Sequence, residues 1–199
     1  IKFIRIINMK ILIAVSHDVF FKPRFLYNLI LRLDEHEIVH VMEVRNVKRK
    51  RISEVSPAKF WGLKGVMVLA IIKLFRKSLS VFPFPAFIRS LSTVKRVSSL
   101  FEIPYSNVLD INNKEVVDYI REIKPDIVVS FQHQIFKKKL LSIPGVKFIN
   151  CHPSLLPKYR GVKPIFWAML NKDDKFGVTV HEMNIKIDCG GIISQREIK

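Results

Sequence analysis

The chain has few of the residues that define several classes of protein. It contains only 2 cysteines and 7 glycines in 199 residues, which excludes a disulfide framework and a collagen-like repeat. No apolar run approaches the roughly 20 residues that cross a bilayer, and the longest, residues 65–72, lies between two lysines. The first residues lack the small-residue cleavage site of a secretory signal. We therefore expect a cytoplasmic protein.

Acidic residues are also scarce. Lys and Arg number 34 against 17 Asp and Glu, which gives a formal net charge of +17. Residues 45–100 alone hold 13 of the basic residues and a single acidic one, Glu54. Such a charge favours an anionic partner, which could be nucleic acid, acidic lipid or a phosphorylated substrate.

The beginning of the chain has the pattern of an α/β protein. Residues 10–16 form a β-rich apolar run, residues 21–34 carry apolar side chains at helical spacing, and residues 37–44 are a second β-rich run. A strand, a helix and a strand in this order predict the opening of a parallel sheet.

The rest of the chain divides into a basic insertion and a second α/β stretch. We interpret residues 45–100 as an insertion with helices near 57–77 and 85–100 in a single domain over residues 9–199. After it, we expect strands at 107–111, 126–130, 146–150, 177–183 and 192–198, and helices at 112–124, 136–143 and 164–170. Asn112 followed by Glu115 predicts a capping box. Because the pattern ends on a strand, we expect the natural chain to continue further.

One histidine motif has the wrong context for a metal. His36, Glu37 and His40 fit the zinc-protease pattern H-E-x-x-H, which brings its two histidines together only on a helix. Here the motif lies in a β-branched run, and four residues of strand span roughly 13 Å. We therefore expect no metal site, and surface-facing histidines at the edge of the second strand. Cys151 and Cys189 lack partner ligands, so we interpret them as small buried hydrophobic residues.

Polar side chains gather where a predicted strand ends in a proline-rich loop. Asn150 and His152 are two residues apart, so they share one face of the strand. An amide donor and an imidazole on one face can stabilise an oxyanion and move a proton, and Asp188 could orient His152. The alternative is a histidine that bonds loop carbonyls and an aspartate that caps a turn before Gly190.

The same residues resemble a known family, the folate-dependent formyltransferases. The signature loop reads Asn150-Cys151-His152-Pro153-Ser154-Leu155-Leu156-Pro157-Lys158-Tyr159-Arg160-Gly161, and residues 177–181 and 187–193 match as well. The family includes enzymes that act on methionyl-tRNA, glycinamide ribonucleotide and sugar nucleotides. The resemblance is good over residues 105–199, and over residues 10–44 it rests on the strand–helix–strand pattern.

The resemblance implies a Rossmann-like fold with a mostly parallel sheet, and transfer of a formyl group from 10-formyltetrahydrofolate to an amine. It assigns catalysis to Asn150, His152 and Asp188. It further places the folate pocket at the backbone around Gln134-Ile135-Phe136 and at the loop that begins at His181, and places Ser154 and Leu155 at the gate between donor and acceptor. It implies no metal.

The acceptor stays open at this stage. The turn after the first strand, residues 16–20, has no glycine, which disfavours glycinamide ribonucleotide. We expect a small-molecule amine, with a nucleotide-linked amino sugar as the first hypothesis and methionyl-tRNA as the second. The basic insertion could cap the sheet, contact tRNA, or hold the protein at an acidic membrane surface. A non-catalytic basic binding module on the same fold is the remaining alternative.

Overall fold

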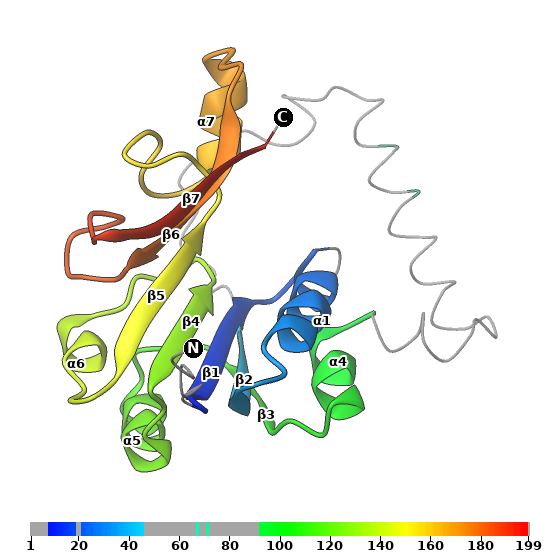
Figure 1. Ribbon diagram of the computed structural model, residues 1–199, viewed down its shortest axis with the longest axis vertical. Helices are drawn as coiled ribbons and strands as arrows, with labels where there is room; N and C mark the ends of the chain where they lie inside the picture. The colour runs from blue at the N-terminus through cyan, green and yellow to red at the C-terminus, as the bar shows by residue number, and fades with distance from the viewer. Residues whose placement is uncertain (1–7, 19–20, 46–66, 68–70, 72–91, 199) are drawn as a thin grey trace, which may run out of the picture.

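A single seven-stranded sheet organises the molecule. Figure 1 shows the computed structural model, which describes residues 8–18, 21–45, 67, 71 and 92–198. The strand order is β3-β2-β1-β4-β5-β6-β7. The strands from β3 to β5 in this order pair in parallel, whereas β6 pairs antiparallel with both β5 and β7. The predicted α/β, Rossmann-like fold is therefore confirmed.

The element boundaries agree with the sequence pattern at many places. The strands are β1 (Lys10–Ser16), β2 (Glu37–Val44), β3 (Tyr105–Val108), β4 (Ile127–Phe131), β5 (Lys147–His152), β6 (Phe176–Glu182) and β7 (Ile192–Ile198). The helices are α1 (Lys22–Arg32), α4 (Val94–Leu100), α5 (Lys114–Ile123), α6 (Lys138–Leu141) and α7 (Pro164–Leu170). The predicted bounds of β1, β2, α7 and β7 are confirmed.

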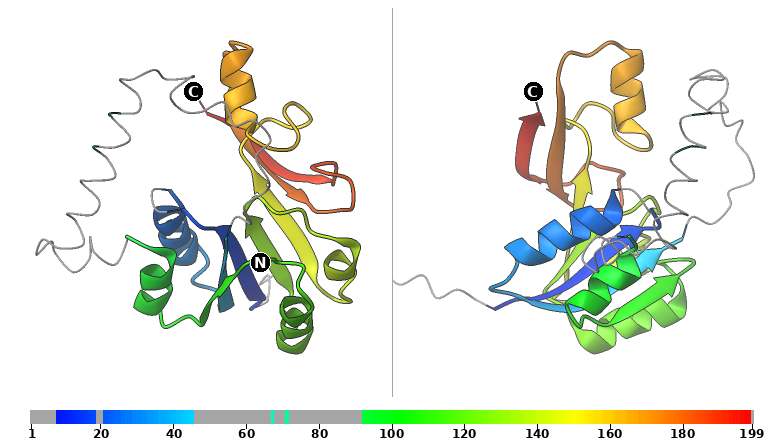
Figure 2. Two further views of the ribbon diagram at one scale, coloured as in Figure 1. Left: turned by 180° about the vertical axis from the view of Figure 1, so that it is seen from behind. Right: turned by 90° about the vertical axis from the view of Figure 1, so that its right-hand side faces the viewer.

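Two apolar layers cover the two faces of the sheet because side chains alternate along each strand. Leu12 and Ala14 of β1 pack in the cluster that includes α5 and α6. Ile13 and Val15 point the other way, into the cluster that includes α1 and α4. The β6–β7 pair and α7 stand beyond this two-layered part, as Figure 2 shows.

Two predictions between β3 and α5 are wrong. The third strand lies at 105–108 instead of 107–111, because Val108 is its last residue paired with β2 and the chain then turns. Asn112 does not cap the following helix. The N-cap of α5 is Asn113, which makes no side-chain cap bond, while the Asn112 side chain bonds the Ile135 carbonyl and the Lys137 N–H.

The predicted helix 136–143 is shorter in the structure, where α6 covers only Lys138–Leu141. Phe136 precedes it as a buried residue of the core, with its ring 5.9 Å from that of Phe148. The helix predicted at 85–100 begins at Val94, and residues 85–91 lie outside the described residues. Of the helix predicted at 57–77, Met67 and Ile71 are described, and both are helical.

The interpretation of His40 as a surface histidine is wrong. Strand β2 lies inside the sheet between β1 and β3, and His40 is buried between β3 and α5. Its Nε2 lies 2.9 Å from Ser106 Oγ and its Nδ1 lies 2.8 Å from Tyr119 OH. Burial lowers the pKa of His40 below its usual value. Both ring nitrogens therefore contact hydroxyl groups, one from β3 and one from α5.

Most of the basic insertion lies outside the described residues, and with it the predicted lipid or tRNA contact. Within the described ranges, no helix is long and apolar enough to cross a membrane.

Candidate active site

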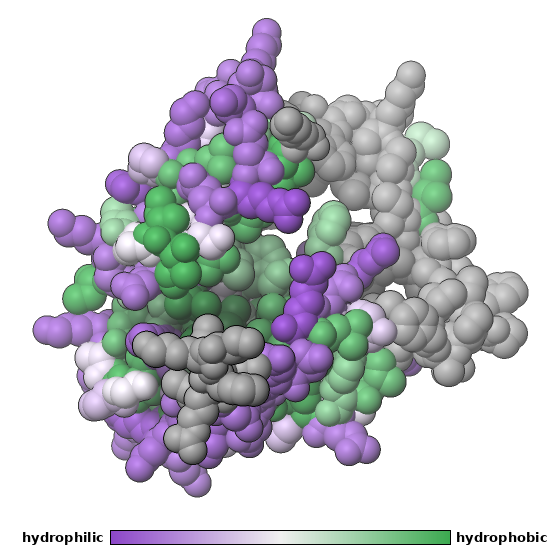
Figure 3. All heavy atoms as spheres, in the orientation of Figure 1, coloured by the Kyte–Doolittle hydropathy of each residue, from purple (hydrophilic) through white to green (hydrophobic). Residues whose placement is uncertain are grey.

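The main cavity opens at the carboxyl ends of β4 and β5, where open α/β sheets bind their ligands. Its volume is about 570 Å³. Its walls come from β4 and the loop after it, from β5, from the loop at residues 161–163 with the start of α7, and from the loop at residues 183–188. Apolar side chains gather in a hollow on the face that Figure 3 presents. Ile135, Ile185 and Ile187 line the cavity although each is about half exposed or more. An apolar rim of this kind fits a flat organic ligand.

Antiparallel pairing of β5 with β6 assembles the polar side chains at this cavity. Asn150 pairs with His181 and His152 pairs with Thr179, so all four side chains lie on one face of the two strands. At His181 the register of β6 against β7 also shifts, which marks a bulge. Bulges re-aim side chains and are frequent beside active sites.

His152 is held by the backbone of the loop that follows β5. It is buried, and its Nε2 lies 2.9 Å from the carbonyl oxygen of Tyr159. Because a carbonyl only accepts hydrogen bonds, Nε2 carries a hydrogen. In neutral His152 the lone pair therefore sits on Nδ1, which lies 3.5 Å from Asp188 Oδ2.

Asp188 connects the loop before β7 to three groups of the site. Its Oδ2 accepts a hydrogen bond of 2.7 Å from the Gly161 N–H, and its Oδ1 lies 3.5 Å from His181 Nε2. Burial raises the pKa of the Asp188 carboxyl, but the hydrogen bonds from protonated His181 and from the Gly161 N–H outweigh it and leave the pKa below its usual value. Asp188 is therefore an anion placed between two imidazoles.

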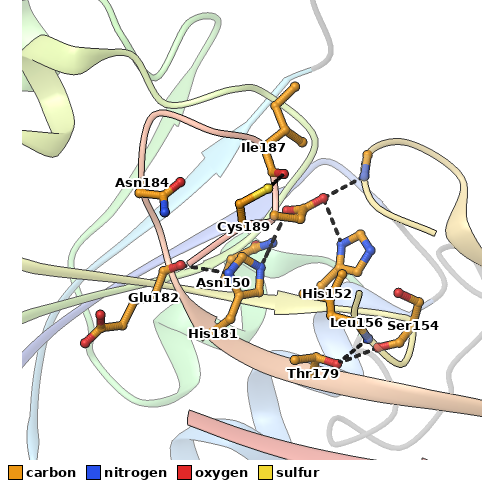
Figure 4. A network of polar contacts seen from close by, with 12 residues as sticks. Asn150, His152, Ser154, Leu156, Thr179, His181, Glu182, Asn184, Ile187 and Cys189 are labelled. Carbon is orange, nitrogen blue, oxygen red and sulfur yellow. Dashed lines mark hydrogen bonds and ion pairs between the residues drawn. The ribbon is translucent and has the colours of Figure 1, made fainter. Parts of the chain in front are cut away.

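His181 was predicted at the start of the folate-binding loop, and its place in this polar centre, beside Asn150 and Asp188, was not predicted. Its Nδ1 lies 2.8 Å from the Glu182 carbonyl oxygen, and its Nε2 lies 3.4 Å from Asn150 Nδ2. Burial by itself lowers the pKa of His181, but the bonds to Asp188 and to the Glu182 carbonyl raise it above its usual value. Figure 4 shows Asn150 and His181 side by side. Only the register of β5 against β6 reveals this pairing.

Thr179 anchors the signature loop and was not among the predicted site residues. Its buried hydroxyl donates 2.7 Å to the Ser154 carbonyl and accepts from the Leu156 N–H at 3.1 Å and from Gln195 Nε2 at 2.8 Å. Ser154 in turn donates to the Lys158 carbonyl, and Leu155 packs against Gly177. Ser154 and Leu155, predicted at the gate, line a second cavity of about 260 Å³ beside α7.

The predicted folate-binding backbone 134–136 is fixed by the side chains of Gln132 and Gln134. The Gln134 side chain accepts from the Ile111 N–H and donates to the carbonyls of Arg45 and Leu109. Gln132 bonds both the N–H and the carbonyl of Gln134. Of these three residues, Ile135 presents an exposed side chain along the cavity.

A glycine allows the Asp188 loop to pass close to β6. A Cβ at Gly190 would lie 1.7 Å from the Glu182 carbonyl oxygen, whereas at the neighbouring Gly191 the nearest atom would be 3.8 Å away. Asp188 itself adopts a left-handed φ of 49°, which aspartate tolerates better than most residues. The loop therefore reaches the site only with glycine at position 190.

The interpretation of both cysteines as small buried hydrophobic residues is not confirmed, because both are free and only half-buried. Burial raises the pKa of the Cys151 thiol, although the charge of Lys22 partly opposes this. Over the described part of the chain, no three His, Cys, Asp or Glu side chains form a group that could hold a metal ion.

The arrangement suits transfer of an acyl-type group to a nucleophile. An amide N–H and an imidazole face one cavity, the Tyr159 carbonyl holds the imidazole at Nε2, and a carboxylate lies 3.5 Å from its Nδ1. Such groups stabilise the oxyanion of a tetrahedral intermediate and carry its protons.

Comparisons with known proteins identify the family. The family described as "Formyl transferase" matches residues 88–199, which is more than half of the chain. The protein therefore belongs to the formyl transferase family, and the predicted class of folate-dependent formyltransferase is confirmed at this level.

The curated proteins that match this chain have names that describe different activities. Over 109 residues the chain is 44% identical to the bifunctional polymyxin resistance protein ArnA of Wigglesworthia glossinidia brevipalpis. Over 106 residues it is 39% identical to the methionyl-tRNA formyltransferase of Thermotoga maritima. These matches cover 54% and 53% of this chain but only 17% and 34% of those proteins.

Solved structures show the same fold. Phosphoribosylglycinamide formyltransferase from Bacillus halodurans superposes with a TM-score of 0.60 at 20% identity, over 95% of this chain and 79% of that chain. A sugar N-formyltransferase from Shewanella sp. FDAARGOS_354 gives a TM-score of 0.54 at 24% identity, over 96% and 57%.

Proposed function

We propose that the protein transfers a formyl group from 10-formyltetrahydrofolate to a primary amine. The observation that carries this proposal is the convergence of Asn150, His152 and Asp188 at one cavity within the family match. The chain spans 17% to 34% of the lengths of the two curated relatives described above, so the activity of the whole protein is a proposal for this chain.

The reaction needs three events at the formyl carbon. The amine nitrogen attacks the formyl carbon and gives up a proton, and the carbonyl oxygen becomes an oxyanion. The oxyanion then returns to a carbonyl as the bond from the formyl carbon to the folate nitrogen breaks and that nitrogen takes up a proton. Asn150 donates its amide N–H to the oxyanion. His152, whose Nε2–H is fixed on Tyr159, uses Nδ1 to carry the proton. Asp188 stabilises the imidazolium that forms, because its carboxylate lies 3.5 Å from Nδ1.

The cavity has the size and surface that the folate donor requires. A volume of about 570 Å³ accommodates a fused-ring ligand. Half-exposed Ile135, Ile185 and Ile187 offer apolar contacts to a flat ring, and the backbone after β4 offers hydrogen-bonding groups. The side chains of Gln134 and Asn112 hold that backbone rigidly in place, which reduces the entropy lost on binding.

The acceptor that we propose first is an amine on a nucleotide-linked sugar. A sugar N-formyltransferase is among the proteins that share the fold, and the chain's charge of +17 favours a phosphorylated substrate. Methionyl-tRNA is the second candidate, supported by the 39% identity to the Thermotoga maritima enzyme and by the same charge.

Formyl transfer should be measured on the full chain with 10-formyltetrahydrofolate and each class of acceptor. We expect turnover with nucleotide-linked amino sugars, and a loss of about a hundredfold or more in Asn150→Ala and in His152→Ala. Asn107→Ala is the matched control, because Asn107 is exposed and its side chain bonds Tyr105 instead of the site.

Two results would decide against parts of this proposal. Undiminished transfer in both site variants would exclude the catalytic assignment. Turnover with methionyl-tRNA but with no amino sugar would select the second acceptor. In that case the apparent tRNA affinity should fall steeply with salt, because phosphate contacts release counterions.

A further inference from the structure

One hydrogen bond determines which nitrogen of neutral His181 carries its hydrogen. Nδ1 lies 2.8 Å from the Glu182 carbonyl oxygen, which accepts hydrogen bonds and cannot donate one, so Nδ1 is protonated. A neutral imidazole has one ring hydrogen. The Nε2 of neutral His181 therefore carries a lone pair and can only accept.

The same logic orients the amide of Asn150. His181 Nε2 lies 3.4 Å from the Asn150 side-chain nitrogen. An acceptor at this position requires the NH2 group of the amide, and not its oxygen, to face His181. One amide hydrogen then lies toward His181, while the second stays free for the cavity, which Asn150 lines.

We propose that neutral His181 is the positioning residue that keeps the Asn150 amide nitrogen at the reacting centre, and that protonation of His181 reverses this amide. The inference rests on the proposed function for its role in formyl transfer. Its structural part stands on the hydrogen bonds alone.

Protonation changes the partner that His181 Nε2 selects. With a hydrogen on Nε2, His181 donates to Asp188 Oδ1 at 3.5 Å, and two donors now face each other across the β5–β6 pair. Asn150 relieves this conflict by turning its oxygen toward His181. The second N–H then leaves the position from which it would reach an oxyanion.

Few other ionisable groups act on His181 among the described residues. Its own face carries Asp188 and the imidazole of His152, whose ring centre lies 6.3 Å away. The side chain of Glu182 comes next in β6 and therefore points to the opposite face. Cys189 donates its thiol hydrogen to the Ile187 carbonyl. The Asp188 carboxylate is thus the anion that stabilises the protonated form of His181.

Nitrogen-15 NMR of the side chains in the wild-type chain tests the structural part without any turnover. We expect His181 to be protonated at Nδ1 in its neutral form, and the Asn150 amide signals to shift as His181 titrates. Two results would overturn the proposal: a neutral His181 that is protonated at Nε2, or Asn150 amide signals that do not shift as His181 titrates.

His181→Gln supplies the matched variant, because its amide oxygen accepts from Asn150 at every pH. We expect the variant to lose the pH-dependent shift of the Asn150 signals. As the pH drops, the rate of formyl transfer by His181→Gln should fall less than the wild-type rate does. His181→Leu has no acceptor for the Asn150 amide, so its rate at neutral pH should be about tenfold or more below that of wild type. Equal acid sensitivity of His181→Gln and wild type would contradict the role in transfer. An NMR result as expected with no formyl transfer in any chain would instead contradict the proposed function.

Discussion

The side-chain nitrogen of Lys22 lies 2.7 Å from the centre of the Phe131 ring and donates a hydrogen bond of 2.8 Å to the Phe131 carbonyl oxygen. This pair joins the start of α1 to the end of β4, where the loop that lines the main cavity begins. Burial lowers the pKa of Lys22 to about 7, against the opposing charges of Asp18 and Cys151.

The buried Lys22 should make stability depend on pH in the alkaline range. Between pH 7 and 10.5 the unfolded chain binds a proton at Lys22 that the folded chain lacks, so stability rises with pH by up to about 1.4 kcal/mol for each unit. Urea unfolding of wild type and Lys22→Met across this pH range measures the contribution of Lys22 to stability. The free-energy difference between the two proteins should change over the range, and a constant difference would contradict the expectation.

Gly190 and Gly191 provide a paired test of the Asp188 loop. In Gly190→Ala the new Cβ collides with the Glu182 carbonyl, so the loop must shift and carry Asp188 away. We expect formyl transfer to fall about a hundredfold, as a displacement of about 1 Å can cause. Gly191→Ala has room for its methyl group and should change the rate little. Kinetics of both variants, with circular dichroism to confirm folding, make the comparison.

The hydroxyl of Thr179 should contribute more to the stability of the fold than the volume of its side chain does. Thr179→Val keeps the shape but leaves the buried Ser154 carbonyl and Leu156 N–H without this partner, at a cost of about 1–3 kcal/mol. Thr179→Ser keeps the hydroxyl and should retain most of this stability. Denaturant unfolding of both variants decides; an unfolding midpoint of Thr179→Val equal to that of wild type would show that the loop is held by other contacts.

Asp188→Asn should lower the pKa of His181. Without the carboxylate, burial is the largest remaining influence on the imidazole, and it favours the neutral form. NMR titration should show His181 of the variant gaining its proton at a lower pH than in wild type. An unchanged titration midpoint would mean that the Asp188 carboxylate does not stabilise protonated His181 in solution.

The fold was predictable where one periodicity dominates. Strand β1 is mainly a buried apolar run, strand β2 is rich in β-branched residues, and α7 begins at Pro164, which favours the first turn of a helix. The predicted boundary of a helix was wrong where a side chain bonds a backbone group that is distant in the sequence. Asn112 looks like a helix cap, but it holds the loop before α6, about 25 residues away in the chain. No local pattern encodes such a contact.

The site was predictable only in part for the same reason. The spacing of Asn150 and His152 places them on one face from strand geometry alone. The roles of His181 and Thr179 depend on the register of β6 against β5, which is a property of the paired strands. The burial of His40 likewise depends on β3 lying outside β2, and the order of strands cannot be read from β2 itself.

The reversal of direction at β6 has a consequence for how the protein folds. The reacting groups, from Asn150 to Asp188, lie on one continuous antiparallel meander, so they meet by closing short segments of chain. The opposite half of the sheet closes over far greater separations, since Lys10 bonds Asp126 across 116 residues. Contacts of low sequence separation cost less entropy to form. The chemical centre can therefore assemble early, as a local unit onto which the parallel half of the sheet later docks.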